Sequence, residues 1–307
     1  TICSPRRLKR PPFLMRCPDH LFLQLAQGRR LKERSGYRGR FAPSPTGVLH
    51  FGNLQTALLS WLQARSLGGE WLLRIDDLDT PRNRPESVLR IQSDLRWLGL
   101  HWDGQPILQS SRRGIYSSWL SFLRRSDLLF ACRCSRRDLA GESIYPGTCR
   151  GIDAGWGWQA QRLPSWRLRV PDHNPYGSGD VVVRRADGFI AYQLATVIDE
   201  LCCGITDVVR GNDLQEALPA QHSIYAALGQ KSPRFWHGPL LCDEAGLKLS
   251  KREASAGLDV ARSNGDDAAR VIGQLAAGLG LVPLGTSLTS QELLSEARDS
   301  HVLPLDS

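Results

Sequence analysis

The chain has 307 residues and a formal net charge of +8, with 41% hydrophobic and 23% charged residues. This length allows one large domain or two modest ones. No apolar run has the length of a membrane-spanning helix or the form of a secretory signal, and eight cysteines in so large a chain do not indicate a disulfide framework, so we expect a cytoplasmic location.

Residues 1–38 form a basic N-terminal extension. Residues 1–39 contain ten Lys and Arg against Asp19 and Glu33, which accounts for the whole net charge, because the remainder balances at 29 basic and 29 acidic residues. The overall charge therefore gives little support for an RNA-binding face on the rest of the chain. Three interpretations of the extension stay open: a disordered or over-extended start, a basic arm that contacts RNA, and a targeting segment.

The segment FAPSPTGVLHFGN at 41–53 predicts a phosphate-binding turn. It follows a short strand at 39–41 and leads into a helix with apolar residues at helical spacing, namely Leu54, Ala57, Leu58, Trp61 and Leu62. A helix N-terminus after a tight turn offers backbone N–H groups and a positive dipole end to a nucleotide phosphate. His50 and Asn53 stand at this entry, with Gly52 between them, where a missing side chain lets ATP approach the backbone.

Acidic residues follow the buried strand that we predict at 71–75. Ligands of open α/β sheets bind off the carboxyl ends of the strands, and Asp76, Asp77 and Asp79 come directly after this one. A carboxylate there can bind a cationic group of a ligand. The alternative for all three is capping and loop solvation.

Cysteines and a tyrosine form the pattern C-x-C-x10-Y-x3-C, with members Cys132, Cys134, Tyr145 and Cys149. Zinc usually takes four ligands, and a close Cys pair followed by a later ligand is a common frame. Three sulfurs leave a structural site one ligand short, so the spacing alone leaves reduced, unliganded thiols as an open alternative. Three further cysteines in apolar sequence are interpreted as small buried residues: Cys202, Cys203 and Cys242.

The segment KLSKR at 248–252 places Lys248 and Lys251 on either side of Ser250, a cation pair suited to a triphosphate. Beyond it, apolar residues at helical spacing predict a helical tail, namely Ala268, Val271, Ile272, Leu275 and Leu279.

Five blocks stand in order along the chain: FAPSPTGxLHxG, LRIDDLDTPR (73–82), DGFIAYQLATVIDE (187–200), ITDVVRGNDL (205–214) and KLSKR. In this order they resemble the glutamyl and glutaminyl branch of the class I aminoacyl-tRNA synthetases, with HFGN and KLSKR in place of the HIGH and KMSKS motifs. The resemblance implies a Rossmann-type parallel α/β catalytic core at 39–252, a connective insertion at about 100–175, and a short helical tail at 253–307.

The same resemblance implies roles for individual residues. Glutamate is bound by Arg40, Phe41, Ala42, Pro43, Ser44, Asp76, Tyr192 and Arg210. ATP is bound by His50, Gly52, Asn53, Lys248, Ser250 and Lys251, of which His50 and Lys251 are catalytic. In glutamate-specific relatives a Glu binds the α-ammonium group, and the aligned residue here is Asp76, one methylene shorter. Two arginines around one small pocket favour glutamate over glutamine, because the planar Arg fork binds a carboxylate in two places.

The resemblance also bears on the cysteines. YPGTC resembles the zinc motif of short glutamyl-synthetase-like proteins, in which the tyrosine is the fourth ligand. It implies one structural Zn²⁺ held by Cys132, Cys134, Tyr145 and Cys149, within the insertion that grips the acceptor end of tRNA in this class. ATP is expected to act with Mg²⁺, for which no protein ligand stands out.

The short C-terminal part bears on the acceptor. Only 55 residues follow Arg252, too few for the anticodon-binding region of a full synthetase. Such a chain resembles the glutamyl-queuosine tRNA(Asp) synthetases, which activate glutamate without tRNA and transfer it to the cyclopentenediol of queuosine at the wobble position of tRNA(Asp). The implied partners are glutamate, ATP and this anticodon loop, and we expect a monomer.

Two other functions stay open. One is a trimmed glutamyl-tRNA synthetase that charges a tRNA 3′ end, and the other is a non-catalytic RNA-binding paralogue. Trp156, Trp158 and Trp166 in the insertion could stack on RNA bases, but ordinary packing is the favoured interpretation. Four arginines could contact phosphates, although each alone is more typical of a solvated surface: Arg136, Arg137, Arg184 and Arg185.

Overall fold

The computed structural model describes residues 14, 15, 17–238 and 258–300, and these divide into two compact units. The parallel-sheet unit comprises Lys32–Ser110, Ile205–Glu216 and the described residues from Pro233 onward. The antiparallel-sheet unit comprises the described residues up to Leu31, Ser111–Gly204 and Ala217–Ser232. None of the described helices combines the length and the apolar character needed to cross a membrane.

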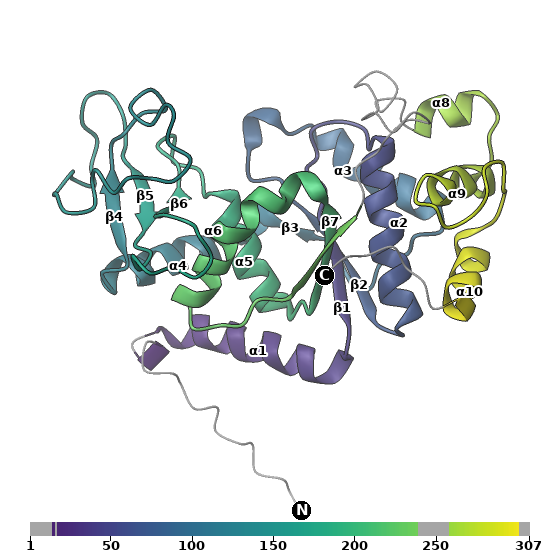
Figure 1. The fold of residues 1–307 in the computed structure, drawn as a ribbon, viewed down its shortest axis with the longest axis horizontal. Coiled ribbons are helices and arrows are strands. Elements are labelled where there is room, and N and C mark those ends of the chain that lie inside the picture. The colour runs from purple at the N-terminus through teal and green to yellow at the C-terminus, as the bar shows by residue number, and fades with distance from the viewer. Residues whose placement is uncertain (1–13, 16, 239–257, 301–307) are drawn as a thin grey trace, which may run out of the picture. The chain divides into compact units, whose positions relative to one another are not determined.

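The parallel-sheet unit contains two parallel ladders, β1-β2-β3 and β7-β8 (Figure 1). The strands are β1 (Arg38–Phe41), β2 (Glu70–Ile75), β3 (Ile107–Leu108), β7 (Asp207–Gly211) and β8 (Arg234–Gly238). β1 lies beside β7, where the Thr206 N–H donates to the Arg38 carbonyl at 2.9 Å. β1 and β2 are buried nearly throughout, as is typical of parallel strands covered on both faces. The predicted parallel sheet is therefore confirmed.

Helices of this unit pack on a common apolar core. They are α2 (Phe51–Ser66), α3 (Pro85–Trp97), α8 (Leu258–Ser263), α9 (Ala268–Ala277) and α10 (Ser290–Ser300). The apolar residues predicted for the helix after the first motif all lie in α2 and belong to this core. α9 and α10 lie against α2, and the Gln55 side chain of α2 donates to the Leu275 carbonyl of α9 at 3.2 Å (Figure 1). Residues near the C-terminus thus help to hold the helix that carries the first motif.

The antiparallel-sheet unit contains a sheet of strand order β4-β5-β6. Its strands are β4 (Leu129–Cys132), β5 (Ser165–Leu168) and β6 (Val181–Arg184), and its helices include α4 (Arg113–Arg125), α5 (Tyr192–Cys203) and α6 (Leu218–Ala227). Asp199 of α5 is buried and accepts hydrogen bonds from Arg112 Nε at 2.7 Å and from the Tyr116 hydroxyl at 2.8 Å. This charged contact joins α4 to α5, beside Cys202 and Cys203, which are only half-buried.

Residues 19–35, inside the segment that the sequence presents as a basic extension, form helix α1 (Asp19–Ser35). Its buried face includes Leu21, Phe22 and Leu25. A side chain at Gly28 would place its Cβ 1.8 Å from the Leu201 carbonyl oxygen of α5, so the two helices touch there backbone to backbone. The charge count of this segment gave no sign of the apolar face, because it registers only the ionised residues and not the spacing of the apolar ones.

Candidate active site and metal centre

His50 caps the N-terminus of α2. Its backbone is extended, and its Nδ1 accepts a hydrogen bond from the Asn53 backbone N–H at 3.3 Å. A neutral imidazole that accepts at Nδ1 carries its proton on Nε2. Partial burial lowers the pKa of His50, against the opposing effect of Asp213, so the neutral form dominates at pH 7. The helix entry thus presents an Nε2–H donor beside the backbone N–H groups of the first turn.

Arg40 and Arg210 lie on the neighbouring strands β1 and β7. Arg40 is only 5% exposed, and its Nη1 lies 3.5 Å from the Val209 carbonyl oxygen, which accepts its hydrogen bond. Arg210, the next residue of β7, is 2% exposed. Guanidinium groups are costly to desolvate, so two of them at adjoining strands favour an anionic ligand.

Arg210 is held by β8. Its Nε donates to Nε2 of His237 at 3.3 Å, and its guanidinium lies 4.7 Å from the centroid of the Phe235 ring. Burial and the nearby charge of Arg210 lower the pKa of His237, which keeps the acceptor nitrogen unprotonated near neutral pH. β8 therefore fixes the direction of the Arg210 side chain.

Asp76 follows β2 as predicted and is buried, and its backbone N–H donates to the Pro43 carbonyl at 3.0 Å. This bond places Asp76 beside the turn that follows β1. The carboxylate oxygens accept from Arg74, Oδ1 from Nε at 2.6 Å and Oδ2 from Nη2 at 3.0 Å. An ammonium group would have to share this carboxylate with Arg74, which is possible because each oxygen has two lone pairs.

The other two acidic residues of this segment have local roles. Asp77 accepts from the Ser110 backbone N–H at 2.7 Å and from its hydroxyl at 2.5 Å, which links the loop after β2 to the short helical turn after β3. Asp79 forms an ion pair with the exposed Arg82, three residues along. The contacts of Asp77 and Asp79 agree with the alternative interpretation of these residues, in which they stabilise the loop and bind no ligand.

The remaining residues of the predicted site are distributed as follows. Phe41 is buried and stacks on Trp71 with ring centroids 6.2 Å apart. Pro43 is buried, Ala42 is half-buried and Ser44 is exposed. Gly52 and Asn53 lie in the first turn of α2, and Tyr192 begins α5 in the antiparallel-sheet unit. Three predicted residues lie outside the described part of the chain: Lys248, Ser250 and Lys251.

A separate cluster joins the end of β4 to a later loop. The sulfur atoms of Cys132, Cys134 and Cys149 all lie within 4.8 Å of one another, and Cys134 and Cys149 are 3.6 Å apart. The Tyr145 hydroxyl oxygen lies 3.4 Å from Cys132 Sγ and 3.9 Å from Cys134 Sγ. Four donors around a tetrahedral zinc would stand about 3.5 to 4 Å apart, given Zn–S bonds of about 2.3 Å. The separation of Cys134 from Cys149 and the two separations from Tyr145 are close to this range, so the predicted ligands are grouped as one metal site requires.

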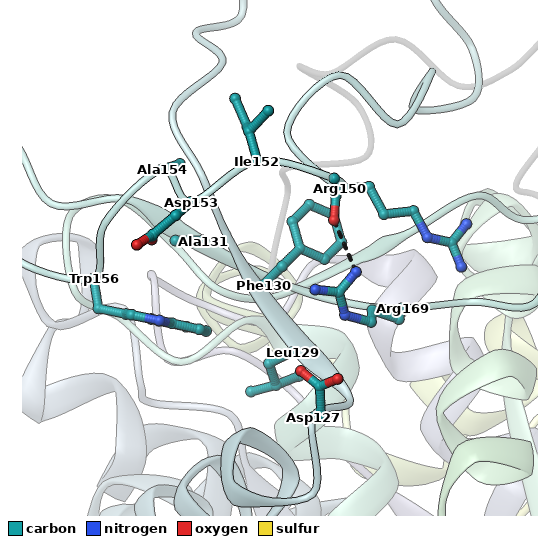
Figure 2. A pocket seen from close by; sticks show the side chains of 11 residues that line it. Asp127, Leu129, Phe130, Ala131, Arg150, Ile152, Asp153, Ala154, Trp156 and Arg169 are labelled. Carbon is teal, nitrogen blue, oxygen red and sulfur yellow. Dashed lines mark hydrogen bonds between the residues drawn. The ribbon is translucent and has the colours of Figure 1, made fainter.

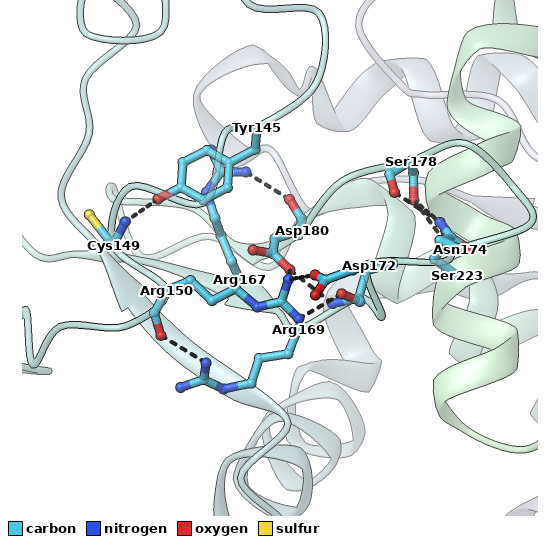
Figure 3. Close-up of polar contacts among 11 residues, drawn as sticks. Tyr145, Cys149, Arg150, Arg167, Arg169, Asp172, Asn174, Ser178, Asp180 and Ser223 are labelled. Atoms are coloured by element: carbon cyan, nitrogen blue, oxygen red, sulfur yellow. Dashed lines mark hydrogen bonds and ion pairs between the residues drawn. The ribbon is translucent and has the colours of Figure 1, made fainter.

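Charged and polar neighbours tune this cluster. Burial raises the pKa of Cys132, but hydrogen bonding with Tyr145 and with the Cys134 backbone, together with nearby Arg167, brings it down to about 7. Burial and hydrogen bonding with Cys149 raise the pKa of Cys134 to about 11. The Arg167 guanidinium lies 3.8 Å from the centroid of the Tyr145 ring, and its Nη1 donates to the Asp180 carbonyl at 2.8 Å (Figure 3). A fixed positive charge thus stands beside a group of thiols that bind metals as thiolates.

Three neighbours of these sites were missed from the sequence: Arg74, Arg167 and His237. Arg74 and Asp76 stand two residues apart at the end of one strand, so the alternation of side chains was a usable signal. Arg167 reaches the cysteines only through the pairing of Phe130 with Arg167 between β4 and β5, and His237 reaches Arg210 only through the pairing of β7 with β8.

Comparison with known proteins places these features in a family. The model of the catalytic domain of class I tRNA synthetases (E and Q) matches residues 37–143 and 170–296. A protein of Parasynechococcus marenigrum (strain WH8102), named glutamyl-Q tRNA(Asp) synthetase, is 70% identical over 282 residues, which cover 92% of this chain and 96% of that protein. A protein of the same name from Chromobacterium violaceum is 44% identical, over 80% of this chain and 87% of its own length.

A solved structure gives the same answer for the fold. The crystal structure of glutamate-tRNA synthetase from Elizabethkingia anophelis is similar with a TM-score of 0.65 and 26% identity, over 84% of this chain. The similarity spans only 65% of that longer protein. The family match covers well over half of the chain, and the parallel sheet, capped helix and paired arginines stand inside it. The chain therefore belongs to the class I tRNA synthetases of the E and Q type and carries their catalytic domain.

Proposed function

We propose that this protein activates glutamate with ATP, without tRNA, and transfers it to the queuosine cyclopentenediol at the wobble position of tRNA(Asp). The names of relatives up to 70% identical support this acceptor. The observation that carries the choice of amino acid is the burial of Arg40 and Arg210 on adjoining strands. Their guanidinium groups suit the side-chain carboxylate of glutamate, while Asp76, shared with Arg74, takes the α-ammonium group.

Activation needs positioning more than proton transfer. The α-carboxylate of glutamate is already ionised at neutral pH, and one of its oxygens attacks the α-phosphorus of ATP. The bond from that phosphorus to the bridging oxygen breaks, and pyrophosphate leaves as glutamyl-adenylate forms. His50 donates from Nε2 to a phosphate oxygen, and the N–H groups at the start of α2 stabilise the charge that develops there. We assign Lys251 and Lys248 to the departing pyrophosphate, and Gly52, Asn53 and Ser250 to binding of ATP.

Transfer completes the reaction. A hydroxyl group of the queuosine ring attacks the carbonyl carbon of the adenylate, AMP leaves, and a glutamyl ester remains on the tRNA. The hydroxyl proton leaves with solvent or a phosphate oxygen. Tyr192, at the start of α5, is assigned to the glutamate pocket with Phe41, Ala42, Pro43 and Ser44.

We also propose one structural zinc, held by Cys132, Cys134, Tyr145 and Cys149. When bound, it would fix the loop of residues 145–149 to the end of β4 and take no part in the reaction. Arg167 would offset part of the negative charge that three thiolates bring to the site.

The test is transfer of radiolabelled glutamate to three RNAs: tRNA(Asp) with queuosine, the same tRNA without queuosine, and tRNA(Glu). We expect label only on tRNA(Asp) with queuosine. Removal of the 3′-terminal adenosine from this tRNA should not prevent the labelling. Label on tRNA(Glu) that requires its 3′ end would instead favour the alternative, a trimmed glutamyl-tRNA synthetase. The solved structure that this chain resembles is that of a glutamate-tRNA synthetase. Absence of both label and glutamate-dependent pyrophosphate release would exclude both enzymes.

A further inference from the structure

The three tryptophans of the segment after β4 have different surroundings. Trp156 and Trp166 pack edge to face with centroids 5.1 Å apart, and the Arg124 guanidinium lies 4.1 Å from the centroid of the Trp156 ring. These two rings fulfil the expectation of ordinary packing. Trp158 is 67% exposed, whereas the other eight tryptophans, all within the described residues, are buried or half-buried.

The loop that carries Trp158 is held firmly. The guanidinium of Arg133 donates to the backbone carbonyls of Ala154 at 2.5 Å, Gly155 at 3.1 Å and Gly157 at 2.8 Å. Just beyond, a tight turn brings Ala160 and its neighbour Gln161 into positive φ, at 47° and 58°. Non-glycine residues adopt this conformation at a cost in free energy. The Arg133 bonds and this turn thus define the backbone of a loop whose largest apolar side chain, Trp158, faces solvent.

A groove of about 310 Å³ lies along β4, bounded by Asp127 on one side and by residues 150–156 on the other (Figure 2). We call it the β4 groove. Trp156 and Arg169 lie toward its opposite ends (Figure 2). Its volume is at the lower end of the range for small-ligand pockets, which is about 300 to 1,000 Å³.

Arg169 supplies the positive charge of the β4 groove. It lies over the Phe130 ring, and its Nη1 donates to the Arg150 carbonyl at 2.9 Å, which fixes the guanidinium. Its Nε is buried and has no hydrogen-bond partner among the described residues. The Arg150 side chain is directed elsewhere, because it binds Asp172 at 2.9 Å and the Val170 carbonyl at 2.7 Å.

Charge and polarity indicate the class of ligand. Residues 124–169 contain nine arginines and no lysine against four carboxylates, an excess of five positive charges. Asp127 and Asp153, which also line the β4 groove, accept hydrogen bonds, so the lining suits a group that combines a phosphate with amino donors. A nucleotide of RNA is such a group, and proteins recognise RNA loops by stacking splayed bases on aromatic side chains and Arg planes.

We propose that Trp158 and the β4 groove form a contact surface for a single-stranded segment of the tRNA substrate, with a base stacked on Trp158 and a phosphate bound by Arg169. This inference rests on the proposed function, since it takes tRNA as the substrate. It adds RNA-binding residues to those assigned to glutamate and ATP.

The experiment measures RNA affinity without catalysis. Wild type, Trp158→Ala, Trp158→Phe and a control, Leu89→Ala, are titrated with unmodified tRNA(Asp) transcript and with a double-stranded RNA of equal length. Leu89 is an exposed apolar residue of α3 in the parallel-sheet unit. Loss of one stacked base weakens binding about 5- to 150-fold, so we expect that loss for the Ala variant on the tRNA, little change on the duplex, and recovery by Phe. Leu89→Ala should bind as wild type does.

A second pair of variants tests the phosphate contact. Arg169→Gln should reduce the slope of log affinity against log salt concentration by about 1, and Arg169→Lys should keep the wild-type slope. Melting temperature and glutamate-dependent exchange of pyrophosphate into ATP check that each variant is folded.

The outcomes separate this inference from the proposed function. A Trp158→Ala protein that binds the transcript as tightly as wild type overturns the inference, even when glutamate is transferred normally. Binding that depends on Trp158 in a protein that transfers no glutamate leaves the inference standing and removes the proposed function.

Discussion

Arg74 and Asp76 form a bidentate ion pair at the end of β2, with N···O distances of 2.6 and 3.0 Å. Their side chains are 3% and 6% exposed. The two residues stand on the same side of the chain, because side chains alternate along a strand. The pair fixes the direction of the carboxylate. In the proposed function it also offsets part of the negative charge that the α-ammonium group of glutamate would meet.

Replacement of Arg74 by Met should destabilise the protein strongly. Met retains much of the apolar volume but leaves the Asp76 carboxylate buried without this partner, which costs about 3 to 5 kcal/mol of unfolding free energy. Urea denaturation measures this loss. Arg82→Met is the control, because Arg82 makes the same kind of pair with Asp79 at the surface, where such pairs contribute about 0 to 1 kcal/mol. Equal effects of the two substitutions would contradict the role given to the buried pair.

Substitutions of His50 should separate its two roles. Asn is among the best residues at a helix N-cap, so His50→Asn should keep the melting temperature while it removes the Nε2–H donor. His50→Ala should lose both, with a fall of about 0.5 to 2 kcal/mol in unfolding free energy. We expect both variants to slow pyrophosphate exchange by about 10²- to 10³-fold, as for other lost donors to developing charge. Full activity in the Asn variant would limit His50 to capping.

The elements around the first motif follow directly from the sequence. The sequence predicts a strand at 39–41, a helix after His50 and a buried strand at 71–75, and β1, α2 and β2 stand at these positions. The helical spacing from Ala268 likewise predicted α9. Local sequence was sufficient here because α2 and α9 show helical spacing and β2 is a short, mostly apolar run, as is typical of a strand covered on both faces.

The rest depended on contacts between distant residues. The approach of α1 to α5 at Gly28 joins segments about 170 residues apart, and a count of charges cannot reveal it. The spacing of the cysteines left the fourth ligand undecided, and only the resemblance pointed to Tyr145. Likewise, nothing in the spacing of Arg210 and His237 shows that strand pairing brings them together.

The contact between Arg210 and His237 predicts that glutamate binding depends on pH. Because burial lowers the pKa of His237, the unfolded chain takes up its proton first as pH falls below about 6.5. The stability contributed by neutral His237 is therefore present above pH 6.5 and is lost as pH falls through the lower folded pKa. As pH falls through this folded pKa, protonation of His237 removes the acceptor for Arg210, so the KM for glutamate should rise more than the KM for ATP.

His237→Gln is the variant that tests this link. The Gln carbonyl can still accept from Arg210 Nε but does not titrate. The KM for glutamate should then stay nearly constant between pH 5.5 and 7.5, as measured by pyrophosphate exchange. A variant with the same pH profile as wild type would assign the titration to another group, such as His50.

The cysteine cluster predicts one zinc per chain. Metal analysis of purified protein should find about one equivalent in wild type and far less in Cys132→Ser or Cys149→Ser, with a lower melting temperature because metal binding contributes to folding. Cys202→Ser is the matched control, because Cys202 lies outside the cluster. Tyr145→Phe should retain zinc with weaker affinity in a chelator competition. Equal zinc in all four variants would place the metal elsewhere.

Helix α1 predicts that residues 19–35 contribute to stability. Gly28→Ala forces a Cβ against the Leu201 carbonyl oxygen, so α1 must move away from α5. Overpacking of this kind destabilises by about 1 to 3 kcal/mol, even though Ala is the better helix former. Gln27→Ala is the control: Gln27 is the exposed neighbour, and the change should remain within about 0.5 kcal/mol. Thermal unfolding of both variants makes the comparison. A Gly28→Ala protein as stable as the control would mean that α1 does not pack on α5 in solution, and the segment would return to its interpretation as a basic arm.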